Sequence, residues 1–367
     1  MKNVLKLIIG LFLFSSLIFF CFLTGLIAKT PLKEAMFYNK LDKGAVQCHL
    51  CPRNCFIVDG KRGYCGVREN QSGTLYALSF GKLVSLNDLD PIEKKPLFHF
   101  LPGVRTFSIA TAGCNLKCKF CQNWEISQKR PEEVDFEYIE PEELIKKVKA
   151  SGLKVVAFTY NEPVVFYEYM LEVAKLAKTE GLITVMHSNG YVNEEPLREL
   201  AKYLDAVNID LKGFSEEYYV KLSEGSLEPV LKTLKILHNA GVHLEITNLV
   251  IPDFNDDPEL IKKMCLWIRD NLGADTPLHF SRFWPMYKLS NLFPTPVDAL
   301  ERARSIAKAS GLKYVYIGNV GGHEAQNSYC PKCGKIVIER KGYFIMQNNI
   351  ANGKCKFCGE IILGIWE

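Results

Sequence analysis

The chain reads Thr106-Phe-Ser-Ile-Ala-Thr-Ala-Gly-Cys114-Asn-Leu-Lys-Cys118-Lys-Phe-Cys121 where a β-branched run meets three closely spaced cysteines. The run predicts a buried strand, and the cysteines follow it with the spacing C-x3-C-x2-C. Iron–sulfur clusters usually take one thiolate per iron, so three cysteines on a four-iron cluster leave one iron open to another ligand. A zinc knuckle is the alternative, but the position of the loop directly after a strand argues against it. We therefore predict a 4Fe-4S cluster on Cys114, Cys118 and Cys121.

Short β-branched runs alternate with segments of helical period from residue 105 onward, which predicts a parallel sheet with crossover helices. The expected strands are residues 106–111, 155–159, 183–187, 206–211, 244–250, 278–283 and 314–317. The expected helices are residues 141–150, 165–180, 194–203, 229–240, 258–271 and 297–310. This alternation favours an α/β fold, a partial (β/α) barrel over residues 105–320 with its chemistry at the carboxyl ends of the strands. A complete barrel and an open doubly wound sheet are the alternatives.

The composition is that of a globular protein, with 48% hydrophobic and 23% charged residues in a chain of 367. The 45 Lys and Arg against 41 Asp and Glu give a net charge of +4. Four lysines before residue 34 and Glu34 contribute +3 of this, so the rest of the chain is nearly neutral. Such a body lacks the positive charge that accompanies extended phosphate contacts, so there is no strong nucleic-acid signal.

The amino terminus contains an uncharged, hydrophobic run at residues 7–27, which is long enough to span a bilayer. The run is longer than the core of a usual signal peptide, and no small-residue cleavage site stands out. We interpret residues 1–30 either as an uncleaved membrane anchor or as the product of a mis-assigned start, with translation beginning near Leu32 or Met36. In both cases a reducible cluster places the body of the protein in the cytoplasm, tethered to the membrane if the anchor is present.

Thirteen cysteines are too clustered for ordinary disulfides, because eleven of them fall into three tight groups. This clustering indicates metal ligation in a reducing compartment. The first group has the spacing C-x2-C-x3-C-x9-C within residues 36–104 and consists of Cys48, Cys51, Cys55 and Cys65. Four thiolates close a tetrahedral zinc site or hold a complete iron–sulfur cluster, and both readings stay open. Cys21 and Cys265 stand alone in apolar surroundings and are expected to be buried thiols.

The last group predicts a zinc ribbon over residues 327–367, because two C-x2-C knuckles are each followed by glycine. Its members are Cys330, Cys333, Cys355 and Cys358. A closed site of four thiolates is expected to be structural, and recognition of a protein or RNA partner is the alternative.

Polar residues follow other predicted strands, and together with the cysteine loop they resemble the radical S-adenosylmethionine (SAM) superfamily. Phe120 offers an aromatic face for adenine. Glu162 and Pro163 resemble the turn that holds the SAM amino group in that superfamily, and Asn161 is included for its place beside them. Two further segments resemble those that line the SAM ribose and carboxylate in activases of glycyl-radical enzymes. Their candidate cofactor-binding residues are Ser188, Asn189, Asp210 and Lys212.

The resemblance is closest to the radical SAM member of the AmmeMemoRadiSam system, which is similar to pyruvate formate-lyase activating enzymes. It rests on residues 90–99, 121–128 and 248–252 and extends from about Lys33 to the carboxyl terminus. It implies reductive cleavage of SAM to a 5′-deoxyadenosyl radical, which abstracts hydrogen from a protein or a small molecule, and a low-potential electron donor as partner. The alternatives are a radical SAM enzyme that modifies RNA and a non-enzymatic, zinc-stapled membrane scaffold.

Overall fold

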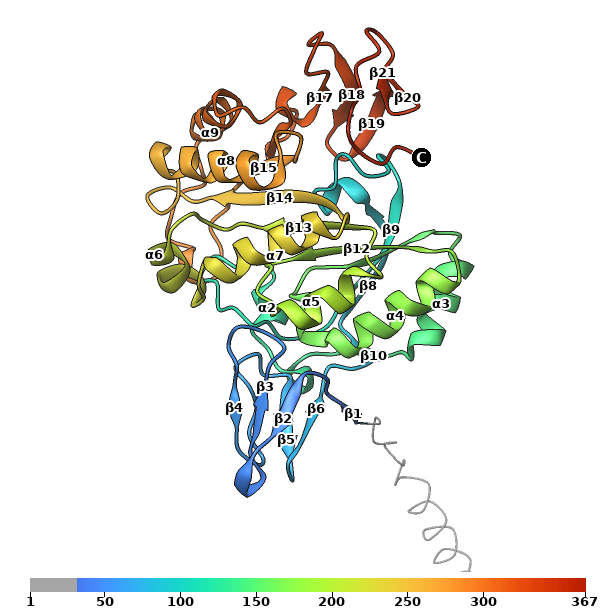
Figure 1. The fold of residues 1–367 in the computed structure, drawn as a ribbon, viewed down its shortest axis with the longest axis vertical. Helices are drawn as coiled ribbons and strands as arrows, with labels where there is room; N and C mark the ends of the chain where they lie inside the picture. The colour runs from blue at the N-terminus through green and yellow to red at the C-terminus, as the bar shows by residue number, and fades with distance from the viewer. Residues whose placement is uncertain (1–31) are drawn as a thin grey trace, which may run out of the picture. The chain divides into compact units, whose positions relative to one another are not determined.

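The computed structural model describes residues 32–367, and its central element is a sheet of eight strands in the order β16-β15-β14-β13-β12-β11-β9-β8 (Figure 1). Seven strands are parallel, and β8 pairs antiparallel with β9 at one edge. The strands are β8 (Ser85–Pro91), β9 (Arg105–Ala110), β11 (Val155–Phe158), β12 (Ile183–Ser188), β13 (Ala206–Asp210), β14 (His243–Val250), β15 (Leu278–Arg282) and β16 (Val315–Gly318). All seven parallel strands lie where the sequence predicts them. Within the described residues the edge strands β8 and β16 do not pair, so the complete barrel is wrong and the partial barrel stays a prediction.

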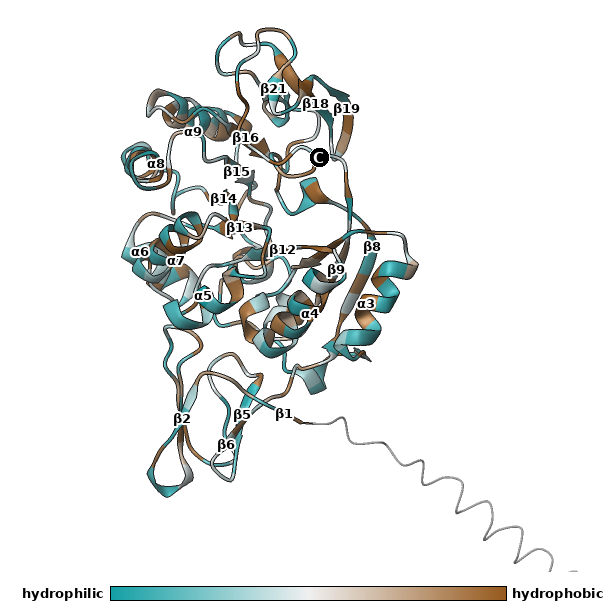
Figure 2. Cartoon of the chain, turned by 45° about the vertical axis from the view of Figure 1, so that its right-hand side comes forward, coloured by the Kyte–Doolittle hydropathy of each residue, from teal (hydrophilic) through white to brown (hydrophobic). Residues whose placement is uncertain are grey.

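Amphipathic helices connect the parallel strands, and each of the six predicted helices is present. They are α3 (Pro141–Ala150), α4 (Tyr167–Thr179), α5 (Glu194–Ala201), α7 (Glu228–Asn239), α8 (Pro258–Leu272) and α9 (Val297–Ala309). In α3 the apolar residues Leu144, Ile145 and Val148 recur at helical spacing and are buried. Figure 2 shows hydrophobic and hydrophilic residues alternating along α3 and α4, as expected for helices with one buried face. Two short helices, α2 (Trp124–Ser127) and α6 (Glu216–Tyr218), lie in loops.

The two faces of the sheet differ because side chains alternate along each strand. Val156 and Phe158 belong to the main hydrophobic core with the helices, whereas Val155 and Ala157 pack with Phe100 in a separate cluster on the other face. Towards the middle of the sheet that second face becomes polar. Buried or half-buried polar residues at alternating positions there include His187, Asn208, Asp210, Glu245, Thr247 and His279.

The amino-terminal part consists of two small antiparallel sheets of three strands each. One contains β2 (Tyr38–Lys40), β3 (Val46–Cys48) and β4 (Phe56–Ile57), and the other contains β1 (Lys33–Glu34), β6 (Thr74–Ala77) and β5 (Arg68–Gln71). A two-stranded sheet of β7 (Lys82–Leu83) and β10 (Glu137–Tyr138) follows. Val46, Ile57 and Leu75 belong to the same hydrophobic core as the central sheet. The cysteines of this part are therefore held against the body of the protein.

The carboxyl-terminal part, residues 327–367, forms a small β structure whose core it shares with residues of the body. Its strands are β17 (Ser328–Tyr329), β18 (Ile336–Lys341), β19 (Phe344–Asn348), β20 (Ile350–Ala351) and β21 (Lys354–Cys355). Val337 and Ile338 pack there with Phe98 and Tyr316 of the body. We call this part the ribbon.

Among residues 32–367, no helix combines the length and the apolar character needed to cross a membrane. The hydrophobic run at residues 7–27, and Cys21 within it, lie outside the described residues. The predicted anchor therefore stays a prediction. Cys265 is buried in α8, as expected.

Candidate active site

A cavity of about 390 Å³ opens beside the carboxyl ends of the central strands. All three cysteines of the loop after β9 line it, and so do polar residues that follow β11, β12 and β13. Each sequence-predicted cofactor residue contributes to its wall. These residues are Phe120, Asn161, Glu162, Ser188, Asn189, Asp210 and Lys212. The cavity has the size of small-molecule sites in general, which are about 300–1,000 Å³.

The cysteine loop is shaped by a glycine. Gly113 has a φ of 94°, and a Cβ there would meet Val67 Cγ1 at 2.5 Å and the Cys65 carbonyl oxygen at 3.0 Å. Glycine therefore allows the loop to pass directly against the amino-terminal part. Asn161 anchors the same loop, because its Oδ1 accepts from the Thr111 N–H at 3.3 Å and its Nδ2 donates to the Gly113 carbonyl at 3.0 Å.

The three thiols of the loop fit an iron–sulfur cluster better than a single ion. Their sulfurs do not all lie within 4.8 Å of one another, which a tetrahedral ion would require. The Leu116 N–H donates to Cys114 Sγ at 3.4 Å, and Ser127 Oγ lies 3.1 Å from Cys121 Sγ. Burial, together with the Glu162 carboxylate, holds the pKa of Cys114 well above its usual value, so a bound cation is needed to keep this thiol ionised.

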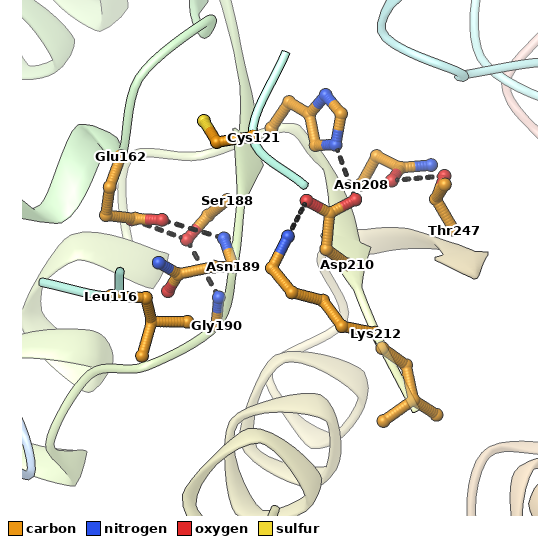
Figure 3. Close-up of polar contacts among 12 residues, drawn as sticks. Leu116, Cys121, Glu162, Ser188, Asn189, Gly190, Asn208, Asp210, Lys212 and Thr247 are labelled. Carbon is orange, nitrogen blue, oxygen red and sulfur yellow. Dashed lines mark hydrogen bonds and ion pairs between the residues drawn. The ribbon is translucent and has the colours of Figure 1, made fainter. Parts of the chain in front are cut away.

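Glu162 follows β11 and organises the next strand end. Its Oε1 accepts from the Val164 N–H at 3.0 Å. Oε1 also accepts from Ser188 Oγ at 2.7 Å, and Oε2 accepts from the Asn189 N–H at 2.7 Å (Figure 3). Burial raises the pKa of Glu162, although these three donors lower it in part. A carboxylate offers about four lone-pair sites, so one direction remains for a ligand donor.

The turn after β12 also depends on glycine. Gly190 has a φ of 70°, and a Cβ would lie 2.9 Å from Ile209 Cγ2. Asn189 Nδ2 donates to Asn115 Oδ1 at 2.9 Å and lies 3.8 Å from Cys114 Sγ. Asn189 therefore joins this strand end to the cysteine loop.

Asp210 ends β13 and carries two basic partners. His187 Nε2 lies 3.0 Å from Asp210 Oδ1, and Lys212 Nζ lies 2.7 Å from Asp210 Oδ2 (Figure 3). Burial alone would raise the pKa of Asp210, but Lys212 and His187 outweigh it and hold the pKa well below its usual range. Lys212 Nζ also lies 5.7 Å from the centroid of the Phe120 ring, which is itself buried. The pair presents a cation and an anion side by side on the cavity wall.

Several cavity residues were missed from the sequence. His187 lies within a predicted strand and lines the cavity. The available signal was its position two residues after Val185, because residues i and i+2 share a face of a strand. Tyr343, between β18 and β19 of the ribbon, also lines the cavity and had no sequence signal. Lys94, in the segment 90–99, lines the cavity. His99 of the same segment and His279 of β15 are buried and do not line it.

The ribbon cysteines form a compact group in which all four sulfurs lie within 4.8 Å of one another. Cys330 Sγ is 3.6 Å from Cys358 Sγ, and Cys333 Sγ is 3.8 Å from Cys355 Sγ. Four sulfurs at about 2.3 Å from one tetrahedral ion stand about 3.8 Å apart. The ribbon therefore offers a site for a single metal ion.

Comparison with known proteins identifies the superfamily. A family model described as Radical SAM superfamily matches residues 108–264. An uncharacterized protein of Methanocaldococcus jannaschii is 47% identical over 333 residues, which cover 90% of this chain and 99% of that protein. Residues 108–264 therefore match a radical SAM domain, a family that implies a 4Fe-4S cluster and SAM as cofactors.

More distant relatives include activating enzymes. Pyruvate formate-lyase 1-activating enzyme of Escherichia coli K12 is 26% identical over 237 residues, covering 59% of this chain and 93% of that enzyme. A solved domain of a pyruvate-formate lyase-activating enzyme from Bacteroides vulgatus matches with a TM-score of 0.39 and 18% identity, covering 45% of this chain and 98% of that one. The chain is thus similar to enzymes of the activating class, while the AmmeMemoRadiSam resemblance stays a prediction.

Proposed function

We propose that the chain binds a 4Fe-4S cluster on Cys114, Cys118 and Cys121 and binds SAM beside it in the strand-end cavity. A reduced cluster with one open iron supplies the electron that cleaves SAM to a 5′-deoxyadenosyl radical. The observation that supports this is the convergence of three thiols, Glu162 and the Asp210–Lys212 pair on one cavity.

Three polar residues of the cavity wall suit different parts of SAM. The remaining lone pair of Glu162 suits the amino group of SAM, because a buried carboxylate favours a charged donor. Lys212 suits the SAM carboxylate, and Asp210 is an acceptor for ribose hydroxyls. Phe120, Ser188 and Asn189 complete the wall, with Phe120 as an apolar surface for adenine.

The hydrogen donor is proposed to be a protein, as in activases of glycyl-radical enzymes, with a small molecule as the second choice. The relatedness to pyruvate formate-lyase activating enzymes supports the protein substrate. Assignment to the AmmeMemoRadiSam branch belongs to the same proposal. A low-potential, one-electron donor is the expected partner.

The ribbon is proposed to hold a structural zinc ion. The compact spacing of its four sulfurs supports a single ion, and zinc is the usual ion of paired C-x2-C knuckles. Residues 36–104, 105–320 and 327–367 are proposed as the three functional parts of the chain.

The test is SAM cleavage by protein reconstituted without oxygen. With a strong reductant, wild-type protein is expected to release 5′-deoxyadenosine, and the Cys114→Ala, Cys118→Ala, Cys121→Ala triple variant is expected to release none. A Cys265→Ala variant is the matched control, because that thiol is buried in α8 and does not line the cavity. Wild-type protein that holds iron and sulfide but forms no 5′-deoxyadenosine would contradict the proposal.

A further inference from the structure

The four cysteines of the amino-terminal part line a second, smaller cavity. Its wall includes Cys48, Cys51, Cys55, Cys65, Arg68 and Asn115. The cavity lies against the main core, because Val164 and Val165 contribute to the same wall. The sequence left open whether these cysteines bind zinc or a cluster, and the spacing of their sulfurs separates the two.

Within the described residues, no three of these four sulfurs lie within 4.8 Å of one another, although the ribbon sulfurs do. One tetrahedral zinc ion would hold its four sulfurs about 3.8 Å apart. A cube of four irons binds one thiolate at each outward corner, so its thiolates stand further apart. The loop cysteines Cys114, Cys118 and Cys121 share this wide spacing. The amino-terminal group therefore resembles the cluster-binding loop and differs from the ribbon.

Arg68 adds an independent observation. Its side chain is almost completely buried, it lines the cavity, and its Nη1 lies 3.6 Å from Cys48 Sγ. Nη2 is paired with the buried Glu168 carboxylate, but the buried Nε has no hydrogen-bond partner in the structure. An unpaired N–H of a buried guanidinium is costly. The inorganic sulfides of a cluster would add acceptors inside this cavity to those that the four thiolates supply.

We propose that Cys48, Cys51, Cys55 and Cys65 hold a second 4Fe-4S cluster. Four thiolates occupy all four irons, so this cluster has no open position for a substrate and is suited to electron transfer.

The position of the second site gives it a role. Asn115 lines its cavity and directly follows Cys114, and the Cys65 carbonyl would lie 3.0 Å from a Cβ on Gly113. The second cluster takes one electron from a low-potential, one-electron donor and passes that electron to the Cys114 site, with no proton or group transferred. This role rests on the proposed function, whereas the presence of the cluster does not.

Metal analysis of protein reconstituted without oxygen tests the site. Wild-type protein is expected to hold about eight irons and eight sulfides per chain, and the triple variant of the Cys114 loop about four of each. The reduced triple variant is expected to keep the electron paramagnetic resonance signal of a 4Fe-4S cluster. A Cys330→Ala, Cys333→Ala variant is the matched control and should lose zinc but no iron.

About four irons in wild-type protein, together with about two zinc ions, would overturn the proposal without any variant. A result of about four irons in wild-type protein and none in the triple variant would overturn the proposal too, because the Cys114 loop would then hold all of the iron. If wild-type protein holds about eight irons but forms no 5′-deoxyadenosine, the proposed function fails and the second site stands.

Spectroscopy tests the role separately from activity. A Cys51→Ser, Cys55→Ser variant should show only the Cys114 cluster. In reduced wild-type protein, the spectrum is expected to be broadened by interaction between neighbouring clusters. A wild-type spectrum equal to the sum of the two variants' spectra would overturn the electron-transfer role.

Discussion

The central sheet carries two carboxylates on neighbouring strands, Asp210 and Glu245, that pair with histidines. At the carboxyl end of β13, Asp210 pairs with His187 at 3.0 Å and opens to the cavity. Near the amino end of β14, Glu245 pairs with His279 at 2.6 Å and is completely buried. The same chemistry therefore occurs in two settings, one accessible to ligands and one sealed.

The sealed pair is closed by the ribbon. Glu245 also accepts from the His99 N–H at 2.7 Å, and His99 Nε2 lies 2.6 Å from the Tyr316 hydroxyl. Tyr316 continues to Ser328 at 2.8 Å, and Arg340 donates to Ser328 Oγ at 2.9 Å. The network joins β16 to the segment before β9. Access, and not residue type, separates a candidate ligand site from a structural one.

The largest effect on stability is expected at the sealed end. Glu245→Ala removes the acceptor of His279 and of the His99 N–H, and breaking such a buried pair costs about 3–5 kcal/mol. Denaturant unfolding of metal-loaded protein measures this. Glu217→Ala is the control, because its exposed pair with Lys221 is screened by solvent and contributes little to stability. A change below about 1 kcal/mol for Glu245→Ala would remove the distinction between the two ends.

A pH-dependent effect is expected from His99. Burial lowers the pKa of His99 to about 4 from its usual 6.5. Between these values the unfolded chain binds more protons than the folded one, so stability falls as the pH decreases from about 6.5 to about 4. The loss attributable to His99 is about 3 kcal/mol. A His99→Gln variant should lose this part of the pH dependence in unfolding curves; identical pH profiles for variant and wild type would contradict the assignment.

The open end is expected to respond through ligand binding. Asp210→Asn keeps the shape of the side chain but removes a charged acceptor, which weakens SAM binding by about 1.5–3 kcal/mol, or roughly 10- to 100-fold. Titration of cluster-loaded protein with SAM gives the dissociation constant. The control is Asp298→Asn, because Asp298 is exposed on α9. Asn255→Asp would not serve as a control, because the Asn255 amide donates to the Lys212 carbonyl. A variant that binds SAM as tightly as wild type would exclude Asp210 from the SAM site.

The two ends also differ in how far the sequence predicted them. The parallel strands and helices were predictable, because β-branched runs alternate with helical periods. Glu162 and Asp210 were predictable because they lie at strand ends and resemble segments of the radical SAM superfamily. Edge strand β8 was missed, since Ser85–Pro91 is rich in polar residues and lacks an apolar face. The role of His99 was not predictable, because it depends on Glu245 and Tyr316, which are distant in sequence and contact His99 only in the folded sheet.

The smallest effect on stability is expected at Tyr343, where the ribbon reaches the open end. Its side chain is 46% exposed and lines the cavity, so Tyr343→Ala should change the free energy of unfolding by no more than about 0.5 kcal/mol. The proposed SAM contacts all lie in the body, whereas Tyr343 lies in the ribbon. The rate of 5′-deoxyadenosine formation without substrate should therefore stay within about twofold of that of wild-type protein, which corresponds to about 0.4 kcal/mol. Thermal unfolding and 5′-deoxyadenosine assays measure the two effects. A loss of stability approaching that of Glu245→Ala would mean that this tip of the ribbon belongs to the sealed network, and the ribbon would then have no separate part at the cavity.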